Sequence, residues 1–382
     1  MITDDILYIG VNDKEIDLFE GQYMVPNGMS YNSYVILDEK IAVMDTVDHR
    51  KKDEYLAALD AALGGRNPDY LVVSHVEPDH ASSIRAFLEK YPGVQLVGNA
   101  KTFPMLAQYF DLNFDAALAV KEGDVLTLGK HELHFIMTPM VHWPEVMFTY
   151  DSFSKVLFSA DAFGKFGSLD AEEDWICEAR RYYFNIVGKF GAPVQTVLKK
   201  AAALDLQIIC PLHGPVLKDN LDYYLGKYQI WSSYEPESEG VFIAYASLHG
   251  NTACAANKLK EILTEKGCPK VAIADLARDD MAEALEDAFR YGKIVFAASS
   301  YNGSVMPFME DFLHHLKGKN YQKRTVALIE NGSWAPSANR AMTELLSQMK
   351  DISILDSSVT IRGALKDEDV QVLSDLADAL LS

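Results

Sequence analysis

The sequence predicts an α/β protein of two domains, each built around its own β-sheet. Its 382 residues are 49% hydrophobic and 24% charged, which is an ordinary globular composition with length enough for two cores. Up to about residue 230, short apolar runs separated by turn residues predict a mixed, sheet-rich domain. Beyond the polar stretch 234–240, strands and helical patterns alternate, which is typical of a parallel sheet covered on both faces. We therefore expect domains 1–238 and 239–382.

In the first domain, helical patterns lie near residues 51–64, 80–91 and 192–204. Four apolar runs predict strands, and a potential metal ligand stands at or just beyond the end of each. The runs are DYLVVS (69–74), HFIMTPMVH (134–142), KVLFSAD (155–161) and LQIICPLHG (206–214). Sheets of this kind place their sites at the carboxyl ends of the strands, so we expect these ligands to meet.

In the second domain, five apolar runs predict the strands of a parallel sheet. They are residues 241–246, 271–275, 293–300, 324–330 and 352–360. Helical patterns such as 251–267 and 337–350 lie between them and supply the crossovers that parallel strands require.

Charge and composition exclude several classes of function. A formal net charge of -20 and a pI near 4.9 would repel a phosphate backbone, so we expect no nucleic-acid partner. No apolar stretch is long enough to span a bilayer and the amino terminus does not look like a signal peptide, so we expect a cytoplasmic protein. The four cysteines form no C-x-x-C pair, which argues against disulfides and cysteine metal sites.

The segment SHVEPDHASSI (74–84) holds four potential ligands, His75, Glu77, Asp79 and His80. Taken alone, Asp79 could equally cap a helix while the other three stay solvated. Three further candidates at strand ends, His142, Asp161 and His213, make coincidence a poor explanation. Seven groups suit two ions, and Asp161 is the natural bridge because paired metals sit ~3.5 to 4 Å apart.

Side-chain direction then divides the other six ligands between the two ions. Residues 75 and 77 point the same way in an extended segment, while residues 79 and 80 follow the turn at Pro78. One ion would take His75, Glu77 and His142, and the other would take Asp79, His80 and His213. His49, His131 and His134 are expected to lie outside this site.

The pattern H-x-E-x-D-H with later His, Asp and His resembles the metallo-β-lactamase fold, an αββα sandwich. Glu77 stands where its zinc hydrolases have histidine, and an added carboxylate suits iron in its higher oxidation state. This substitution is similar to that of the flavodiiron proteins. The segments GMSYNSYVI (28–36), DTVDH (45–49), HWPEVMF (142–148) and CPLHGP (210–215) also look like that family. The resemblance implies a centre of two irons, beside which Trp143, Tyr182 and Tyr183 are candidates to line a pocket for a small gas. Core packing is an equal alternative for the tyrosines.

Three loops of the second domain resemble the flavin-binding loops of flavodoxins and flavodiiron proteins. They follow the first, third and fourth strands and imply a flavodoxin-like, doubly wound fold that binds FMN. The predicted cofactor-binding residues are Ser247, Leu248, His249, Gly250, Asn251, Thr252, Ser299, Ser300, Tyr301, Asn302, Gly303, Asn331, Gly332, Ser333, Trp334 and Ala335. The chain departs from simple flavodoxins at His249, Ser299 and Ala335-Pro336, which bears on the environment of the flavin ring. A plain capped turn remains the alternative for the first loop.

The resemblance implies reduction of O2 to water or of NO to N2O, with electrons from a separate donor such as rubredoxin. Two ferrous ions and a reduced flavin together hold the four electrons that O2 requires. We expect the minimal two-domain arrangement of the family and a head-to-tail homodimer, or a dimer of such dimers. The alternatives are a dizinc hydrolase fused to a flavin domain and a non-enzymatic gas or redox sensor.

Overall fold

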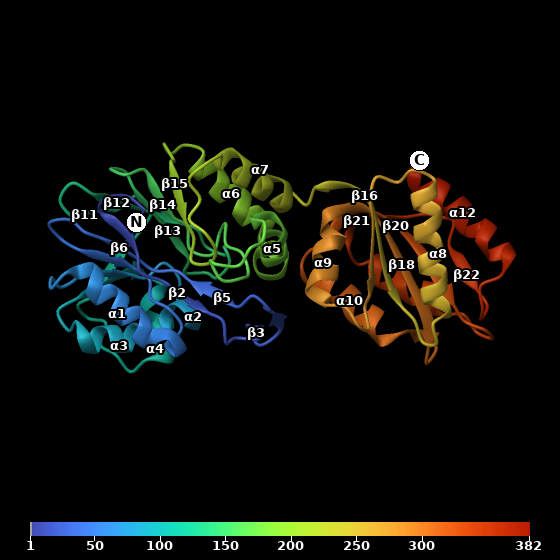
Figure 1. Ribbon diagram of the computed structural model, residues 1–382, viewed down its shortest axis with the longest axis horizontal. Coiled ribbons are helices and arrows are strands. Elements are labelled where there is room, and N and C mark those ends of the chain that lie inside the picture. Colours follow the sequence, from blue (N-terminus) through green and yellow to red (C-terminus); the bar gives the residue numbers. More distant parts are fainter. Residues whose placement is uncertain (1) are drawn as a thin grey trace. The chain divides into compact units, whose positions relative to one another are not determined.

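The computed structural model describes residues 2–382, which divide into two compact units (Figure 1). The first ends at Gln229 and the second runs from Ile230 to Ser382. This division falls slightly before the expected boundary near 238. Residues just after 229 belong with the second unit because Trp231 Nε1 donates to Glu237 Oε2, at 2.6 Å, and Arg324 donates to the carbonyl of Tyr234, at 2.7 Å.

Two β-sheets form the centre of the first unit. The six-stranded sheet has the order β1 (Ile6–Tyr8), β6 (Tyr34–Ile36), β7 (Ala42–Met44), β8 (Tyr70–Val72), β9 (Gln95–Asn99) and β10 (Leu118–Val120). The five-stranded sheet has the order β11 (Val125–Thr127), β12 (Glu132–Met137), β13 (Met147–Asp151), β14 (Val156–Phe158) and β15 (Ile208–Cys210). Two small ribbons pair β2 (Val11–Asp13) with β5 (Met29–Tyr31) and β3 (Leu18–Phe19) with β4 (Tyr23–Met24).

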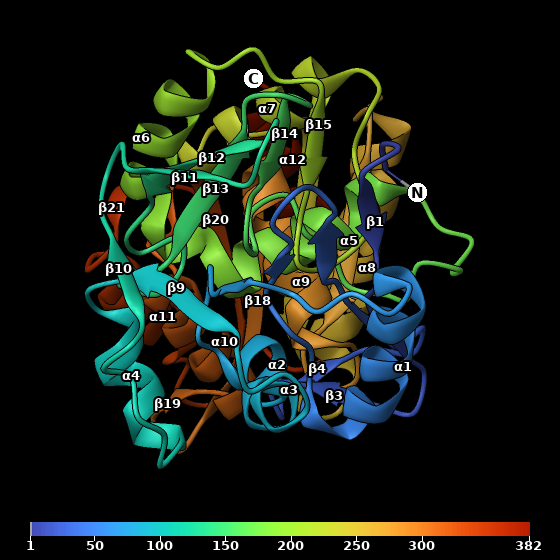
Figure 2. The ribbon, with the colours of Figure 1, turned by 90° about the vertical axis from the view of Figure 1, so that its left-hand side faces the viewer.

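The larger sheets pack face to face, as Figure 2 shows from the side of the first unit. Their inward-facing side chains form one apolar core, in which Tyr34 and Val97 meet Phe135 and Phe158. Strands β7 to β10 are parallel, and β14 and β15 are a second parallel pair. Parallel neighbours end at the same edge, which brings the loops after β8, β14 and β15 within reach of one another.

Helices cover the outer faces of both sheets and complete the αββα sandwich (Figure 1). They are α1 (Lys52–Leu63), α2 (Pro78–Ala81), α3 (Ile84–Lys90), α4 (Thr102–Tyr109), α5 (Trp175–Tyr182), α6 (Gly191–Ala201) and α7 (Leu221–Ser232). The single helix expected over 80–91 is two helices, α2 and α3, interrupted at Ser82-Ser83. Serine hydroxyls compete for backbone partners, and Ser82 Oγ accepts the backbone N–H of His49 at 2.8 Å.

The second unit is a parallel sheet in the order β17 (Val271–Asp275), β16 (Ser238–Ala246), β18 (Tyr291–Tyr301), β20 (Gln322–Asn331) and β21 (Lys350–Ile354). This is the order of doubly wound, flavodoxin-like sheets, and the predicted fold is confirmed. The expected fifth strand over 352–360 is two strands, β21 and β22 (Val359–Ile361), which both pair with β20. The polar residues 356–358 separate them.

Helices cover both faces of this sheet (Figure 1). α8 (Asn251–Glu265) and α12 (Asp367–Leu381) pack on one face with a shared apolar core. α9 (Met281–Arg290), α10 (Pro307–Gly318) and α11 (Ala338–Leu346) form the other layer, and the short strand β19 (Ser304–Val305) pairs with the end of β18.

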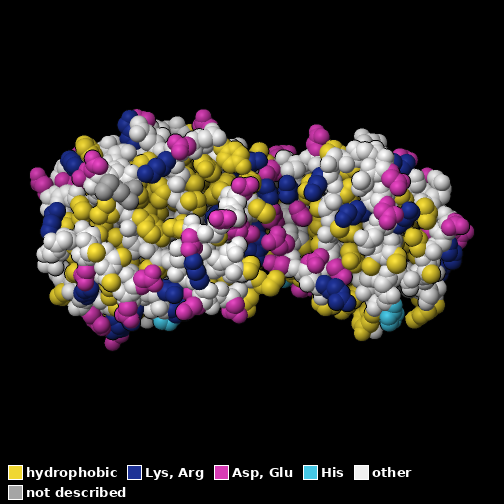
Figure 3. All heavy atoms as spheres, in the orientation of Figure 1, with side chains coloured by type: hydrophobic (Ala, Val, Ile, Leu, Met, Phe, Trp, Pro, Cys, Tyr) yellow, Lys and Arg dark blue, Asp and Glu magenta, His cyan; other side chains and the backbone are white. Residues whose placement is uncertain are grey.

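The surface carries the excess of acid that the sequence predicts, with carboxylates on both units in Figure 3. No helix within residues 2–382 has the length and apolar character needed to cross a membrane. All four cysteines are free thiols.

Candidate metal centre and flavin pocket

All seven predicted metal ligands come together at one end of the sandwich. They form two groups, His75, Glu77, His142 and Asp161 in the first and Asp79, His80 and His213 in the second. The loop after β8 supplies the first two ligands, and Pro78 then starts α2, which carries Asp79 and His80. His142 lies between β12 and β13, while Asp161 and His213 follow β14 and β15.

The first group is compact around the Oδ2 atom of Asp161. His75 Nε2 lies 3.1 Å from Glu77 Oε2 and 3.4 Å from Asp161 Oδ2. His142 Nε2 lies 3.2 Å from the same Glu77 oxygen and 3.0 Å from Asp161 Oδ2. Two imidazole nitrogens and two carboxylates therefore converge on one point.

The second group faces the other oxygen of Asp161. His80 Nε2 lies 3.1 Å from Asp161 Oδ1 and 3.3 Å from Asp79 Oδ2. His213 Nε2 lies 3.2 Å from Asp79 Oδ2 and 3.7 Å from Asp161 Oδ1. The carboxylate of Asp161 thus turns one oxygen to each group, which is the arrangement expected of a bridging ligand.

The loop after β14 holds Asp161 in a fixed position. Its neighbour Ala160 has a positive φ of 47°, and Ser159 Oγ donates to the carbonyl of Ala162 at 2.8 Å. Asp161 is only 1% exposed. A left-handed conformation at a residue with a side chain is costly, and it persists here where the chain must turn to present the ligand.

Opposite charges shift the pKa values of these groups. Burial alone would raise the pKa of Asp161, but the charge of His75 and hydrogen bonds from three histidines hold it well below its usual range. Burial would lower the pKa of His142, but hydrogen bonds to Asp161 and Glu77 raise it to about 9. The carboxylates of the two ligand groups therefore stabilise a positive charge placed between them.

The donor set fits a pair of metal ions. Neither side-chain oxygen of Asp79 has a hydrogen-bond partner among the described residues, although both are buried. A buried carboxylate without donors is expensive, and a cation between Asp79, His80 and His213 would satisfy it. Three carboxylates with four imidazoles suit iron better than zinc in a nitrogen-rich site.

Groups behind the ligands orient two of the histidines. His75 Nδ1 donates to Glu145 Oε1 at 2.7 Å, and this carboxylate is fully buried and also accepts the N–H of Val76 at 3.0 Å. His213 Nδ1 donates to the carbonyl of Ser30 at 2.7 Å. Both contacts leave Nε2 free to face the cluster. Glu145 was not predicted, because its only signal in the sequence is its place within HWPEVMF.

Trp143, predicted to line the pocket, contacts the rings of His75 and His142 at centroid distances of 5.3 and 6.2 Å. The predicted Tyr183 instead packs on Tyr228, at 5.0 Å. Its neighbour Tyr182 packs on His213, at 5.6 Å.

Burial and the charges of the ligand carboxylates raise the pKa of Tyr182. Burial, followed by the charges of Asp161, Asp79 and Glu77, raises its pKa well above the usual range. His49, His131 and His134 lie outside both ligand groups, as expected. His131 is a fully buried partner of Asp151, at 2.9 Å.

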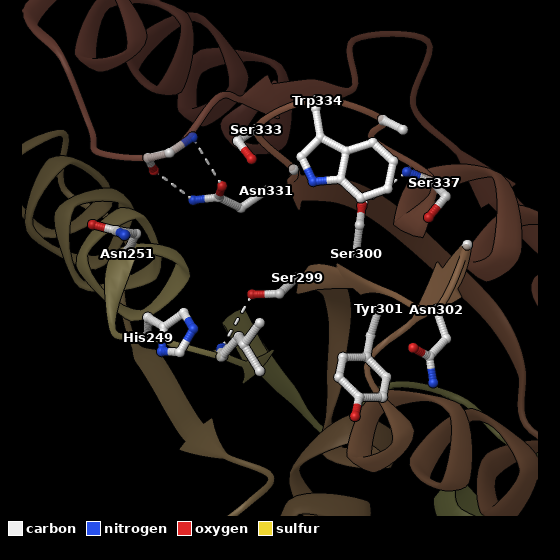
Figure 4. A pocket seen from close by; sticks show the side chains of 15 residues that line it. His249, Asn251, Ser299, Ser300, Tyr301, Asn302, Asn331, Ser333, Trp334 and Ser337 are labelled. Atoms are coloured by element: carbon white, nitrogen blue, oxygen red, sulfur yellow. Dashed lines mark hydrogen bonds between the residues drawn. The ribbon is translucent and has the colours of Figure 1, made fainter.

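The second unit has a pocket of about 500 Å³ at the carboxyl ends of β16, β18 and β20 (Figure 4). It is lined by Leu248, His249, Asn251, Ser299, Ser300, Tyr301, Asn302, Gly303, Asn331, Gly332, Ser333, Trp334, Ala335, Ser337 and Gly363. His249 and Asn251 lie on one side, and Trp334 and Tyr301 lie on the other. Ser337 and Gly363 were not predicted: Ser337 ends the loop after β20, next to the start of α11, and Gly363 follows β22, a strand that the sequence did not separate from β21.

Three predicted cofactor residues, Ser247, Gly250 and Thr252, take part in hydrogen bonds within the first loop. Ser247 Oγ accepts the N–H groups of Gly250 and Ala253 at 3.0 and 3.2 Å. Thr252 Oγ1 bonds Ser299 Oγ at 2.8 Å, and Ser299 Oγ also accepts the N–H of Leu248 at 3.2 Å. These bonds fix the start of α8, at which Gly250 has φ 88°.

The second loop is a tight hairpin. Tyr301 pairs with Ser304 across Asn302 and Gly303, which have φ values of 50° and 74°. Asn-Gly is the preferred pair for such a two-residue turn because both central residues need positive φ. The turn places Tyr301 beside the pocket. Hydroxyls, amides, aromatic rings and the start of α8 fit a flavin with a phosphate tail.

Comparisons with known proteins match both units. Residues 29–214 match a family described as ODP family beta lactamase, and residues 242–369 match a flavodoxin domain. An anaerobic nitric oxide reductase flavorubredoxin of Aeromonas hydrophila is 30% identical over 370 residues, covering 92% of this chain and 74% of that protein. A nitric oxide reductase of Moorella thermoacetica is 29% identical, covering 97% and 95% of the two chains.

Solved structures share the whole fold. The rubredoxin oxygen:oxidoreductase of Desulfovibrio gigas superposes with a TM-score of 0.92 at 25% identity, covering 100% of this chain and 97% of that one. The flavodiiron protein of Giardia intestinalis superposes at 0.93 with 24% identity, covering 100% and 96%, a likeness of fold alone. With both family matches and a relative at 30% identity, this chain is an oxidoreductase of the flavodiiron protein family.

Proposed function

We propose that this protein reduces O2 to water, NO to N2O, or both, at two irons held in the first unit, with FMN bound in the second. The observation that carries the proposal is Asp161, whose two oxygens each face a separate three-residue ligand group. When bound, the irons would supply the site at which the gas is reduced, and FMN would supply electrons. The relatives named as nitric oxide reductases and as a rubredoxin oxygen:oxidoreductase support both substrates.

The residues around the ligands shape the site for a small, uncharged substrate. Trp143 covers His75 and His142 on one side, and the rings of Phe19 and Tyr182 pack on His213 on another. The hydroxyl of Tyr182 is buried and has no hydrogen-bond partner among the described residues. Since its pKa is raised, this hydroxyl keeps its proton at neutral pH and can donate to an oxygen atom of a bound gas.

The pocket in the second unit would receive electrons from a separate protein. We propose a donor of the rubredoxin type, because relatives are named for rubredoxin. Trp334, at 89% exposed, stands on the rim of the pocket where a donor would approach. The protein would act in the cytoplasm, where its free thiols stay reduced.

The test is the cofactor content and the turnover of protein purified after growth with iron. We expect about two irons and one FMN per chain. Anaerobic steady-state rates with one reduced rubredoxin, measured with O2 and with NO separately, then establish the preferred gas. Two zinc ions per chain and no turnover with either gas would refute the proposal.

We further propose a head-to-tail homodimer, alone or paired into a tetramer, in which the FMN of one chain serves the irons of the other. An iron-dead chain, Asp161→Ala, is mixed with a flavin-dead chain carrying His249→Glu and Asn251→Glu, after dissociation and reassembly. Transfer between chains restores roughly a quarter of normal activity, since half the dimers carry one working pair. Verified mixed dimers without turnover would exclude this arrangement.

A further inference from the structure

We infer that His249 is the cation that recognises the phosphate of the bound flavin, so that the affinity for FMN falls as His249 loses its proton. This inference rests on the proposed FMN cofactor. Among the residues that line the pocket, His249 is the one side chain able to carry a positive charge. FMN brings a phosphate of about two negative charges to a chain whose formal net charge is -20.

The position of His249 suits that role. It immediately precedes Gly250, the residue at which α8 begins, and so it lies where helix N–H groups and the helix dipole already favour an anion. α8 is 15 residues long and has no acidic residue in its first turn. In Figure 4, His249 and Asn251 line the side opposite the aromatic residues Trp334 and Tyr301. A flavin whose ring lies beside the aromatic residues would direct its phosphate towards His249.

Most other ionisable groups on the surrounding loops are engaged elsewhere. Glu330 accepts from the hydroxyl of Thr360 at 2.9 Å and from the N–H of Asn339 at 3.0 Å. Arg340 donates to the carbonyl of Gly303 at 3.2 Å, in the hairpin that carries Tyr301. In the loop after β17, Asp275 and Asp279 accept backbone N–H groups of their own loop, and Arg278 lies 3.5 Å from Asp275.

Arg362 is a second cation next to the pocket in sequence, since it precedes the lining residue Gly363. Side chains of β22 alternate between the two faces of the sheet. Ile361 is buried in the core beside α8, whereas Thr360 reaches Glu330, which also bonds the N–H of Asn339 in α11. Arg362 lies just beyond the end of β22 and is exposed, so Arg362→Gln removes one positive charge on a different loop from the one that starts α8. It therefore serves as the matched control.

The test measures the dissociation constants of FMN and riboflavin from apoprotein between pH 5.5 and 8.5. The proteins are the unaltered chain, His249→Gln and Arg362→Gln. A charge pair at the pocket surface is worth roughly tenfold in affinity. Because the charge of histidine changes between about pH 5 and 8, His249→Gln should weaken FMN binding most at pH 5.5, by up to about tenfold, and least at pH 8.5. Riboflavin has no phosphate to titrate, so its affinity at each pH is the reference for the binding of the ring.

Two further readouts isolate the charge. Riboflavin lacks the phosphate, so its affinity should be unchanged by His249→Gln at every pH. About 0.5 M salt should shrink the FMN effect, because ions screen exposed charges. Arg362→Gln should behave as the unaltered chain.

Several outcomes would overturn the inference. They are a ratio for FMN that does not vary with pH, an equal loss for riboflavin, or a larger effect of Arg362→Gln than of His249→Gln. Absence of FMN binding to any of the proteins would instead refute the proposed cofactor.

Discussion

Replacing Glu145 with leucine should weaken iron binding by about 100-fold and destabilise the first unit. The carboxylate is fully buried and accepts two hydrogen bonds, from His75 Nδ1 at 2.7 Å and from the N–H of Val76 at 3.0 Å. Loss of a carboxylate behind a metal-binding histidine typically costs 10- to 100-fold in metal affinity, or about 1.4 to 2.7 kcal/mol. Two buried donors without acceptors would cost a further ~2 to 6 kcal/mol in unfolding free energy.

Glutamine at position 145 separates the two effects. Its amide oxygen can accept both hydrogen bonds, so Glu145→Gln should lose about tenfold in iron affinity while its stability stays near that of the unaltered chain. Anaerobic competition with a chelator gives the iron affinity, and denaturant titration gives the unfolding free energy. Glu122→Gln is the control, because this exposed residue pairs with Lys200 at the surface, where such pairs are worth about 1 kcal/mol or less. A leucine variant that holds iron as tightly as the unaltered chain would refute the reasoning.

Three other changes test separate parts of the molecule. Asp161→Ala should abolish binding of both irons and all gas reduction while the flavin spectrum persists; activity near normal would show that the bridging ligand is misassigned. Tyr182→Phe should lower the turnover number by about tenfold with iron and FMN content unchanged, because one buried donor is removed; an unaltered rate would exclude its hydroxyl from the reaction. Burial opposes but a hydrogen bond to Asp151 raises the pKa of His131, so the contribution of this residue to the unfolding free energy should be full below about pH 6.5 and be lost as pH rises through the raised value. His131→Gln should flatten this decline in denaturant titrations, and an unchanged pH profile would contradict it.

The meeting of the seven candidate metal ligands could be predicted because they follow apolar strands, and parallel strands deliver their ends to one edge. The period-two alternation of side chains also predicted how they divide around Asp161. Glu145 escaped prediction because its partnership with His75 joins residues 70 positions apart through an irregular loop. No periodicity encodes such a contact.

Other details depend on local geometry that no sequence pattern encodes. Tyr182 and Tyr183 are neighbours in sequence, and only the local helix geometry decides which one faces the ligands. Ser247 and Thr252 have the chemistry of phosphate ligands, and their hydroxyl oxygens also form hydrogen bonds within the loop, a contact that the sequence does not reveal. The expected strand 352–360 is divided by a short polar segment. Apolar residues on both sides of this segment make the sequence look like one continuous strand.

Each ligand group draws on both sheets of the first unit, because the loop after β8 belongs to one sheet and His142, Asp161 and His213 belong to loops of the other. Bound metal would therefore hold the two sheets of the first unit together. A ligand at 100 times its dissociation constant adds about 2.7 kcal/mol to stability. Iron scarcity would then shorten the lifetime of the first unit against cellular proteases, while the second unit, with its own core, would be spared. The abundance of intact protein would track iron supply without any change in its synthesis.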